Sequence, residues 1–352
     1  MPLRVAVDAQ ETVGTSTGIG SYCSGLLDAL PGAGVEAVAL RAPGFDPWGF
    51  DRRVIWDQCL LPLRAMHSRA ELLHCTSGSL PFFRMQPTVV TVHDVAWLRG
   101  AQAHAPAYAR WYFGEFSAAR WRSAAHVIAS SAFTRAELLA STQLGHENVT
   151  VVHPGVEPAY MTLVRRPAME ATLLCVGTLE RRKNAAIVIQ ALAGIPGARL
   201  LCAGPPTPYQ DECTALARKL GVDDRVSFLG YVERSRLLEL YATATIAVAP
   251  SRYEGFGYAA AQALCAGIPL VAARSSSQIE VVAGDAALLD ADDAIAWTRA
   301  IAALLEDRQL AEIAAHSRRA RSSKRFSWPS AALATAAVYR AVLEGRQNNR
   351  GL

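Results

Sequence analysis

The chain has 352 residues, of which 51% are hydrophobic and 19% are charged. This composition is typical of a folded globular protein and excludes an intrinsically disordered one, and the length predicts two domains rather than one. The formal net charge of +4 is too small to indicate a nucleic-acid-binding protein. A mild basic excess suits an anionic substrate or an anionic membrane surface, and solubility alone explains it equally well.

The seven cysteines are scattered along the chain without a C-x-x-C pair, and several, such as Cys175 and Cys202, lie in apolar runs. An odd, unspaced set predicts reduced thiols in a cytoplasmic setting rather than a disulfide framework or a zinc site. No apolar run reaches the roughly 18 residues that a membrane-spanning helix needs. We therefore expect a cytoplasmic protein whose contact with a membrane, if any, is peripheral and at the inner face.

Short apolar runs alternate with longer amphipathic segments, a pattern typical of parallel α/β structure. Predicted strands in the first half cover residues 4–7, 35–40, 72–74, 88–92, 126–129 and 149–152. In the second half they cover residues 172–176, 199–203, 226–229, 246–249, 270–272 and 287–289. Helical patterns lie between them, at residues 21–30, 107–122, 135–139, 185–193, 212–220, 234–243, 258–266, 295–305 and 307–323.

The alternation restarts near residue 172, after a segment with three prolines at residues 153–169 that reads as a linker. The chain therefore predicts two Rossmann-like domains of similar size, residues 1–160 and 170–327. Residues 328–345 form a separate predicted helix with Pro329 near its N-terminus, a position that favours proline.

A first candidate motif is formed by Gly18 and Gly20, which open a helix after the first strand. Glycines at this place let the backbone approach a ligand closely, and the helix N-terminus attracts negative charge. The motif is not G-x-G-x-x-G, because residue 23 is cysteine, and the next strand does not end in the acid that would bind a dinucleotide ribose. An ordinary glycine turn explains the pair equally well.

His93 and Asp94 follow the β-branched strand at residues 88–92. Polar residues at a strand end face the crevice in which open α/β sheets bind ligands, so His93 is a candidate to bond a sugar hydroxyl or stabilise charge there. A histidine that only caps the next segment is the alternative.

Residues 177–184 read Gly-Thr-Leu-Glu-Arg-Arg-Lys-Asn, between a strand and a helix. Arg182 and Lys183 lie at a helix start, where positive charge opposes the macrodipole. Local helix stability does not explain them, whereas a bound phosphate does. A solvated basic turn is the alternative.

Glu254 follows the buried strand at residues 246–249 and is followed by Gly255, Phe256 and Gly257. The glycines and the small residues after them bring the backbone close to a ligand, beside a helix N-terminus suited to phosphate. Gln262 lies eight residues beyond Glu254, so a helix over that span would place both on one face. Charge compensation at the helix N-terminus is the alternative role for Glu254.

These motifs, in this order, resemble the retaining glycosyltransferases of the GT-B fold, specifically glycosyltransferase family 4, over nearly the whole chain. In the first half, residues 18–22 resemble the family's glycine loop, residues 91–94 resemble its active-site histidine segment, and residues 130–135 and 153–156 resemble the end of its first domain. In the second half, residues 177–184 resemble its phosphate-binding turn and residues 228–232 resemble its base-binding loop. Residues 284–289 resemble a typical segment of its second domain, and residues 326–328 resemble the start of its last helix. The resemblance implies two Rossmann-like domains with a cleft between them and a C-terminal helix that crosses back onto the N-terminal domain. The first domain would bind the acceptor and the second the nucleotide sugar.

The resemblance also implies roles for single residues. Glu254 and His93 would be catalytic and would contact the transferred sugar. The donor would be bound by Arg182, Lys183, Gly18, Gly20, Gly177, Tyr231, Val232, Gly255, Phe256, Gly257 and Gln262. The resemblance implies no metal and no cofactor, with the nucleoside diphosphate sugar as a substrate.

Two positions depart from the family pattern. The signature has two glutamates separated by seven residues, and the second is Gln262 here. An amide accepts and donates hydrogen bonds, so we expect altered donor binding rather than its loss. Thr178 stands where many members carry a phosphate-binding arginine, and Arg182 beside Lys183 supplies the charge instead.

The activity expected from the resemblance is transfer of a hexose, with GDP-mannose or a related hexose or deoxyhexose donor, to a lipid-linked or oligosaccharide acceptor of bacterial surface polysaccharide, such as lipopolysaccharide. A non-catalytic sugar-nucleotide-binding subunit of a polysaccharide-synthesis complex is the main alternative. A nicotinamide-dependent oxidoreductase would need the complete glycine fingerprint. A storage-polysaccharide phosphorylase or synthase of the same fold is disfavoured by the short chain.

Overall fold

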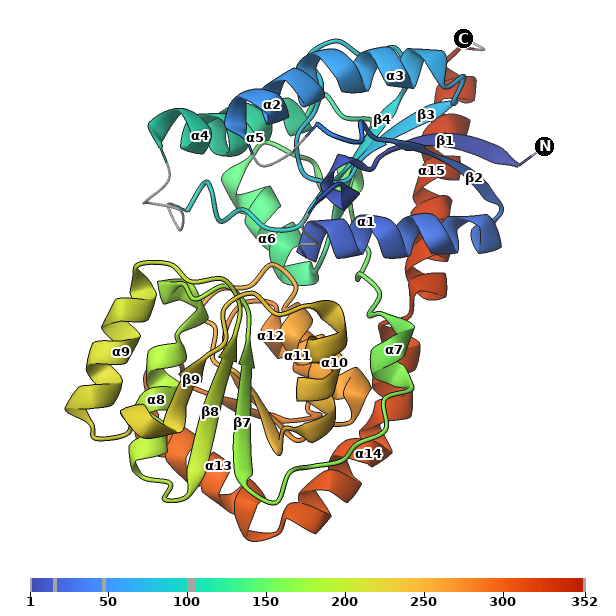
Figure 1. The fold of residues 1–352 in the computed structure, drawn as a ribbon. Coiled ribbons are helices and arrows are strands. Elements are labelled where there is room, and N and C mark those ends of the chain that lie inside the picture. Colours follow the sequence, from blue (N-terminus) through green and yellow to red (C-terminus); the bar gives the residue numbers. More distant parts are fainter. Residues whose placement is uncertain (1, 15–17, 46–48, 100–105, 351–352) are drawn as a thin grey trace. The chain divides into compact units, whose positions relative to one another are not determined.

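A computed structural model describes residues 2–14, 18–45, 49–99 and 106–350. The chain divides into two compact units, one formed by Met1–Gly155 with Ser327–Leu352 and the other by Val156–Phe326. Each unit contains a six-stranded parallel sheet with helices on both faces (Figure 1). The predicted α/β class with two Rossmann-like halves is therefore confirmed.

The sheet of the first unit has the strand order β2-β1-β3-β4-β5-β6. Its strands are β1 (Leu3–Asp8), β2 (Val35–Leu40), β3 (Leu72–Cys75), β4 (Thr88–Val92), β5 (His126–Ala129) and β6 (Val149–Val151). All six strands predicted for this half are present, with bounds within one residue of the prediction. Each is short and apolar, and β4 is buried at every position because helices cover both faces of the sheet.

Two helical layers enclose this sheet. The helices are α1 (Gly18–Ala29), α2 (Phe50–Ile55), α3 (Leu61–His67), α4 (Ala107–Trp111), α5 (Ser117–Trp121), α6 (Ala132–Ser141) and α15 (Trp328–Arg350). Val5 and Val7 of β1 pack against α1 and α15, while Ala6 faces a core that includes α3 and α5. This alternation follows from the two-residue period of a strand.

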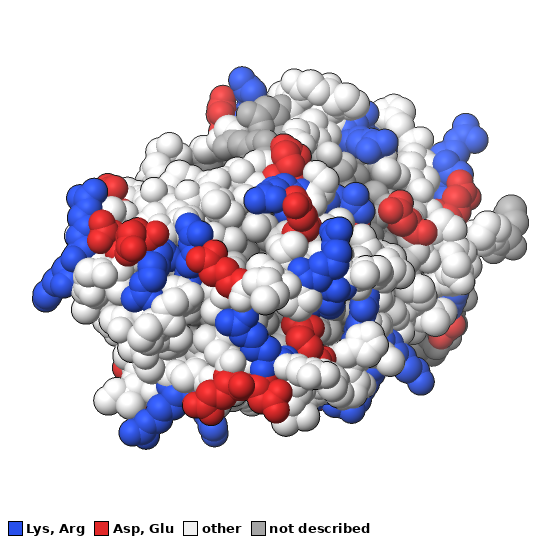
Figure 2. Space-filling model, turned by 60° about the horizontal axis from the view of Figure 1, so that its bottom comes forward, with Lys and Arg blue, Asp and Glu red and all other residues white. Residues whose placement is uncertain are grey.

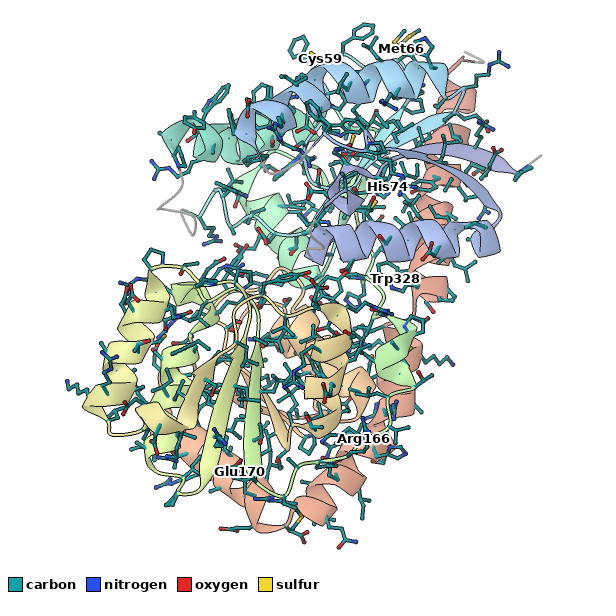
Figure 3. The ribbon with its side chains drawn as sticks, in the orientation of Figure 1. Cys59, Met66, His74, Arg166, Glu170 and Trp328 are labelled. Atoms are coloured by element: carbon teal, nitrogen blue, oxygen red, sulfur yellow. The ribbon has the colours of Figure 1, made fainter. Side chains whose placement is uncertain are left out.

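The helix α15 returns to the first unit, as predicted, and packs against α1 and β5. Trp328, labelled in Figure 3, lies against two glycines. A Cβ atom at Gly25 would come within 2.0 Å of the Trp328 ring, and one at Gly155 within 2.4 Å. Only glycine therefore admits the indole at these two positions.

The α2–α3 region was not predicted as helical. A π-helical turn at Trp56–Leu60 joins α2 to α3, so the helix runs without a break from residue 50 to residue 67. Pro62 lies inside this continuous helix, directly after the π-helical turn, and its missing backbone N–H leaves one carbonyl of the preceding turn without a helical hydrogen bond. The apolar residues of this helix lie on both of its sides, which removes the amphipathic period that predicts a helix.

The second unit has the strand order β12-β11-β10-β7-β8-β9. Its strands are β7 (Ala171–Val176), β8 (Ala198–Ala203), β9 (Val226–Phe228), β10 (Ile246–Ala249), β11 (Leu270–Ala273) and β12 (Ala287–Leu289). Its helices are α7 (Pro158–Met161), α8 (Ala185–Ala193), α9 (Tyr209–Lys219), α10 (Arg234–Thr243), α11 (Tyr258–Ala266), α12 (Gln278–Val282), α13 (Ala294–Glu306) and α14 (Arg308–Arg325). The short helices α7 and α12 were not predicted.

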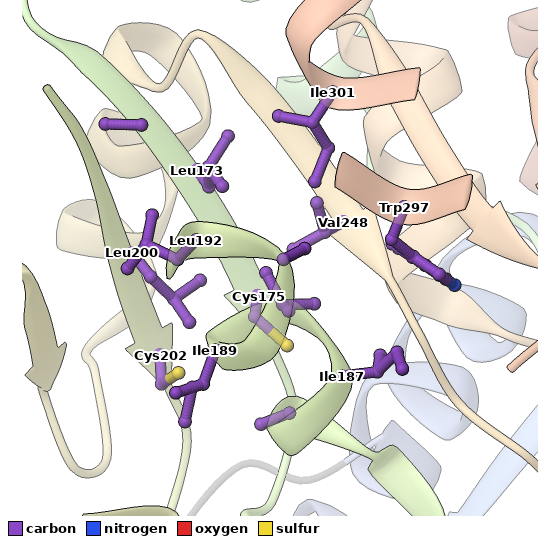
Figure 4. Packing of buried hydrophobic residues seen from close by; sticks show 14 of the residues in the cluster. Leu173, Cys175, Ile187, Ile189, Leu192, Leu200, Cys202, Val248, Trp297 and Ile301 are labelled. Carbon is purple, nitrogen blue, oxygen red and sulfur yellow. The ribbon is translucent and has the colours of Figure 1, made fainter. Parts of the chain in front are cut away.

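The two faces of this sheet carry separate hydrophobic cores. On one face, Leu173 and Cys175 of β7 pack with Ile187 of α8 and with Trp297 of α13 (Figure 4). On the other face, Leu174 belongs to a core that includes α10, α11 and Phe326. Burial on both faces holds the strand ends, and therefore the loops that follow them, in fixed positions.

Charged side chains of both signs are interspersed over the face that Figure 2 presents. The net charge of the chain is therefore not gathered into one patch on that face. None of the helices in the described part of the chain is both long enough and apolar enough to cross a lipid bilayer.

Candidate functional site

The strand order of the second unit identifies where a ligand is expected. From β7 the chain builds the sheet outward through β8 and β9, and then returns to the other side of β7 to add β10. The order therefore reverses between β7 and β10, and crevices at the carboxyl ends of such strands bind ligands in open α/β sheets. The loops that follow these two strands contain the motifs of residues 177–184 and 251–257.

The loop after β7 is a tight turn. Gly177 has φ of +137°, and a Cβ atom there would approach the Lys183 side chain to 3.3 Å. A 3-10 turn at Arg181–Lys183 then leads into α8, with Asn184 in the left-handed conformation at the N-cap. The Asn184 side-chain amide donates to the Ala291 carbonyl at 2.8 Å, which anchors the turn.

The structure brings Glu254, Arg182 and Lys183 together. Lys183 Nζ donates to Glu254 Oε1 at 2.6 Å, and an Arg182 nitrogen lies 3.5 Å from Glu254 Oε2. Ser251 Oγ also donates to Glu254 Oε1, at 2.7 Å. Arg182 is held from its other side by Glu180, at 2.9 Å. The acid and the two cations of separate motifs therefore form one cluster.

The Glu254 side chain is buried, with 8% of the residue exposed. Burial by itself raises the pKa of this carboxyl, but the charges of Lys183 and Arg182 and the hydrogen bonds from Lys183 and Ser251 outweigh burial, so that the pKa lies below its usual value. Glu254 is therefore ionised at neutral pH. Its carboxylate can accept hydrogen bonds, and it cannot donate a proton.

Glu254 does not belong to the helix that follows it. The helix α11 begins at Tyr258, with Gly257 at the N-cap in the left-handed conformation, φ +90°. Glu254 and Gln262 therefore do not lie on one continuous helical face. Gln262 Oε1 instead accepts a hydrogen bond from the Tyr241 hydroxyl at 3.2 Å.

A pocket opens beside the Lys183–Glu254 pair. Its walls are formed by residues from the two loops and from the start of α11: Cys175, Val176, Gly177, Thr178, Leu179, Lys183, Ala185, Ala249, Pro250, Ser251, Glu254, Gly257, Ala259, Ala260 and Gln278. Four of the predicted site residues thus line one pocket. The other predicted site residues of the second unit are not among its walls: Arg182, Tyr231, Val232, Gly255, Phe256 and Gln262.

Ser251 and Gln278 are site residues that the sequence-based prediction missed. The buried Gln278 side chain donates to the Ser251 carbonyl at 2.9 Å, while the Ser251 hydroxyl holds Glu254. Ser251 is the first residue of the motif of residues 251–257, so its spacing from Glu254 was a usable signal. Gln278 follows an unpredicted turn, and no local pattern indicates it.

His93 follows β4 in the first unit. Its Nε2 lies 2.8 Å from the Thr76 carbonyl, which can only accept, so Nε2 carries the hydrogen. Burial lowers the pKa of His93, so the ring is neutral at pH 7 and Nδ1 is its acceptor nitrogen. The ring of Tyr22 packs edge-on against it, with centroids 4.7 Å apart.

Behind His93 lies a buried polar network that the sequence did not indicate. His74 Nδ1 is 2.6 Å from the Tyr339 hydroxyl of α15, and its Nε2 is 2.8 Å from Thr91 Oγ1. Thr91 Oγ1 is in turn 3.0 Å from the Tyr22 hydroxyl. Burial, followed by the nearby His93, lowers the pKa of His74 to about 3. A neutral His74 thus connects α15 to the ring that packs on His93.

Gly18 and Gly20 begin α1. At Gly18 an added Cβ atom would meet no described atom within 4 Å, and Gly20 is buried. They belong to the first unit, whereas the pocket beside Glu254 belongs to the second.

The first unit has its own reversal of strand order, between β1 and β3. There the buried Arg53 of α2 contacts three carboxylates: Glu11, Asp57 at 3.0 Å and Asp8 at 3.8 Å. Asp8 also accepts from Trp56 Nε1 at 2.9 Å. Burial, opposed by Arg53, raises the pKa of Asp8 to about 6. Asp8 is the last residue of β1, and neither it nor Arg53 was predicted as a site residue.

Comparison with known proteins identifies both halves of the chain. Residues 17–160 match the family model described as Glycosyltransferase Family 4. Residues 162–321 match the model described as Glycosyl transferases group 1. The boundary between the two matches falls close to the division between the two compact units.

The curated relatives that match this chain include glycosyltransferases with different named activities. A glycogen synthase of Mycobacterium tuberculosis is 31% identical over 299 residues, which are 80% of this chain and 70% of that protein. A D-inositol 3-phosphate glycosyltransferase of Xylanimonas cellulosilytica is 38% identical over 181 residues, 49% of this chain and 43% of that protein. One of Mycolicibacterium smegmatis is 32% identical over 58% of this chain and 50% of its own length. The chain thus matches about half the length of these two inositol phosphate glycosyltransferases.

Solved structures share the fold over almost the entire chain. The sucrose-phosphate synthase of Thermosynechococcus elongatus has a TM-score of 0.78 at 22% identity and covers 97% of this chain and 100% of that one. Anabaena HepE, solved with UDP and glucose, has a TM-score of 0.72 at 18% identity over 96% and 100%. WaaG, a glycosyltransferase involved in lipopolysaccharide biosynthesis, has a TM-score of 0.72 at 16% identity over 94% and 98%. Because both halves match glycosyltransferase families and the whole chain has this fold, the protein belongs to the GT-B glycosyltransferases.

Proposed function

We propose that the protein transfers a hexose from a nucleoside diphosphate sugar to an acceptor hydroxyl, with retention of configuration at the anomeric carbon. The observation that carries the proposal is the convergence of Lys183 and Arg182 on Glu254 where the strand order of the second sheet reverses. A diphosphate needs cations, and a sugar needs hydrogen-bond acceptors. This cluster offers both, beside the N-terminus of α11.

In the proposed reaction the bond between the anomeric carbon and the diphosphate oxygen breaks, and the acceptor oxygen bonds to that carbon. The acceptor proton passes to the leaving phosphate. Charge therefore builds on the diphosphate, and Lys183 and Arg182 stabilise it. Because these side chains neutralise the charge themselves, the proposed step uses neither a divalent metal nor a cofactor.

Donor binding requires an exchange of partners. The Lys183 ammonium donates a hydrogen bond to Glu254, and a bound diphosphate would compete with that carboxylate for it. Once Lys183 turns to phosphate, Glu254 accepts hydrogen bonds from the sugar and supports the positive charge that develops on its ring. His93, neutral with Nδ1 as acceptor, is assigned to the sugar hydroxyls as well.

The remaining donor contacts keep their sequence-based assignments in this proposal. Gly177, Gly255, Phe256 and Gly257 would border the phosphates, and Gly18 and Gly20 belong to the same set. Tyr231 and Val232 would contact the base. Gln262 would bond the ribose, using its amide in place of the usual carboxylate.

GDP-mannose, or a related hexose or deoxyhexose donor, is the donor expected from the sequence. UDP-glucose is the second candidate, because HepE was also solved with UDP-glucose. The proposed acceptor is a lipid-linked or oligosaccharide acceptor of a bacterial surface polysaccharide, reached at the cytoplasmic face of a membrane, and the likeness to WaaG supports it. The inositol phosphate glycosyltransferases among the relatives favour a small polyol phosphate as the competing acceptor.

A panel of nucleotide sugars tests the donor assignment. The true donor should raise the melting temperature, because a ligand that binds only the folded state stabilises it, and should be consumed with release of its nucleoside diphosphate when acceptor is added. NMR of the product reports the anomeric configuration, and activity after chelation with EDTA reports on metals. Donor binding without turnover against every acceptor class would favour the non-catalytic subunit instead.

A matched pair of variants tests the site. Lys183→Ala should weaken donor binding about tenfold to a hundredfold, the worth of a hydrogen bond to a charged group. Arg181→Ala removes an exposed neighbouring cation whose partner is Glu212, and it should leave donor affinity nearly unchanged. Equal affinities for wild type and Lys183→Ala would reject this assignment of the diphosphate site.

A further inference from the structure

The helix from α2 to α3 exposes a row of apolar side chains. Ile55, Cys59, Leu63 and Met66 recur every three or four residues, which places them on one side of a helix. Ile55 is 46% exposed and Leu63 52%. Figure 3 shows Cys59 and Met66 on the outward side of this helix. The opposite side is already buried in the core of the first unit, so the exposed row has no structural task there.

A neighbouring loop extends this apolar row. Phe82, Phe83 and Met85 are 76%, 62% and 62% exposed. The loop is fixed to the helix at both ends, because Gln58 Oε1 accepts from the Phe82 backbone at 2.7 Å and Gln86 Nε2 donates to the Ala65 carbonyl at 2.8 Å. The row and the loop therefore form one continuous surface, here called the aromatic face: Ile55, Cys59, Leu63, Met66, Phe82, Phe83 and Met85.

Two arginines border this surface. The Arg120 guanidinium lies 4.8 Å from the centre of the Phe82 ring. Arg84 and Arg120 both donate to the Pro81 carbonyl, which holds their charges side by side. Neither forms an ion pair with a carboxylate of the described residues. Two cations without an acidic partner, next to exposed aromatic rings, indicate a ligand that is anionic and apolar at once.

We propose that the aromatic face docks on an anionic phospholipid bilayer, with Phe82 and Phe83 inserted among the acyl chains and Arg84 and Arg120 at the lipid phosphates. Exposed apolar surface of this extent marks an interaction site, and apolar residues bordered by arginines are what interfacial membrane binding requires. A second copy fits less well, because the aromatic face and its two bordering arginines include no carboxylate that could pair with the arginines of the other copy. The inference names the part of the protein that would contact the membrane carrying the proposed lipid-linked acceptor. Lipid binding itself does not depend on the transfer reaction.

Co-sedimentation of the full chain with vesicles tests this proposal. The protein should bind vesicles of phosphatidylcholine mixed with phosphatidylglycerol, and bind phosphatidylcholine vesicles more weakly. The double variant Phe82→Ser/Phe83→Ser should lose about tenfold or more in apparent affinity, because two apolar side chains leave the bilayer. Arg84→Gln/Arg120→Gln should lose about fivefold per arginine and its preference for the anionic lipid, whereas Arg84→Lys/Arg120→Lys should keep that preference.

The matched control is Leu310→Ser/Ile313→Ser on α14, which removes two apolar side chains of similar exposure in the second unit. It should bind vesicles like the wild type, and all variants should be checked for an unchanged melting temperature. Absence of binding to the anionic vesicles, or an equal loss in the control, would overturn the proposal. The proposal would also be overturned if the protein did not bind vesicles and instead formed a dimer in sedimentation velocity that the Phe82→Ser/Phe83→Ser variant abolished. The assay measures vesicle binding and not sugar transfer. A negative result would therefore not contradict the proposed reaction, and failure to find a nucleotide-sugar donor would not contradict membrane binding.

Discussion

The two sheets place charged clusters of different composition at equivalent positions. In the second unit, the loops at the reversal of strand order bring two cations, Arg182 and Lys183, to one buried carboxylate, Glu254. In the first unit, the corresponding position holds one buried cation, Arg53, surrounded by three carboxylates. Arg182 also pairs with Glu180, so the charges of the second cluster balance, whereas carboxylates outnumber the cation in the first.

The difference suggests why such a chain has two similar domains. In the proposed reaction, the excess of carboxylates in the first unit would disfavour an anionic donor at that position. The two clusters also differ in exposure. Lys183 is partly exposed, with 19% of its side chain accessible, whereas 4% of the Arg53 side chain is accessible. Solvent and ligands therefore have little access to the Arg53 cluster of the first unit. The Lys183 ammonium of the second unit is accessible enough to change its hydrogen-bond partner.

The largest expected effect follows from removing the buried cation of the first unit. Arg53→Ala leaves three buried carboxylates without their cation, so the unfolding free energy of that unit should fall by about 3–5 kcal/mol. Hydrogen exchange of the β1 and β3 amides measures it. Arg52→Ala, at an exposed arginine of the same helix, should have a much smaller effect. Wild-type stability for Arg53→Ala would show that the acids are neutralised in another way, and the contrast between the two clusters would fail.

Removal of the buried acid of the second unit should separate catalysis from binding. Glu254→Ala should lower kcat about 10²–10³-fold, the cost of losing one charged group that acts on the transition state. Donor affinity should stay equal or improve, because Lys183 and Arg182 lose a competing carboxylate. Steady-state kinetics and calorimetry measure the two effects, with Glu212→Ala as the surface control. Parallel losses of rate and affinity would contradict the exchange of partners.

Asp8 should make the stability of the first unit depend on pH. Its pKa is raised from 3.8 to about 6 in the folded protein, so the folded state binds the proton more tightly than the unfolded chain does. The resulting stabilisation is complete below about pH 4 and is lost as the pH rises through 6, by about 3 kcal/mol in all.

The buried His74 acts in the opposite sense, because its pKa is lowered and its protonation in the unfolded chain favours unfolding at low pH. The difference between wild type and Asp8→Asn in denaturant melts from pH 4 to pH 7 isolates the Asp8 contribution. A difference that does not change with pH would mean that Asp8 titrates normally.

The smallest expected effect concerns the network behind His93. Tyr339→Phe removes the hydroxyl that lies 2.6 Å from His74 Nδ1, and it should cost about 1 kcal/mol of unfolding free energy. Urea unfolding measures it, with Tyr108→Phe at an exposed tyrosine as the control. An unchanged midpoint would show that the hydroxyl contributes nothing to holding His74.

The strands could be predicted well because each is a short apolar run between polar segments, and burial on both faces imposes that pattern. The helices α2 and α3 could not, because the continuous helix is apolar on its core side and again on its exposed aromatic face, which removes the amphipathic period. Glu254 and Lys183 were identified singly from their positions after strands. Their pairing, between residues 71 positions apart, depends on β7 and β10 being neighbours in the sheet.

The sequence by itself determined the class of fold, the division into two domains and the residue types available for chemistry, because these follow from local patterns of apolar and polar residues. Only the tertiary structure decided which charges meet. It joined Lys183 to Glu254, enclosed Arg53 among three acids, and left Glu254 outside the helix on which it was expected to share a face with Gln262. The physical reason is that parallel strands distant in the chain become neighbours, and their loops meet at one edge of the sheet where charges interact at short range.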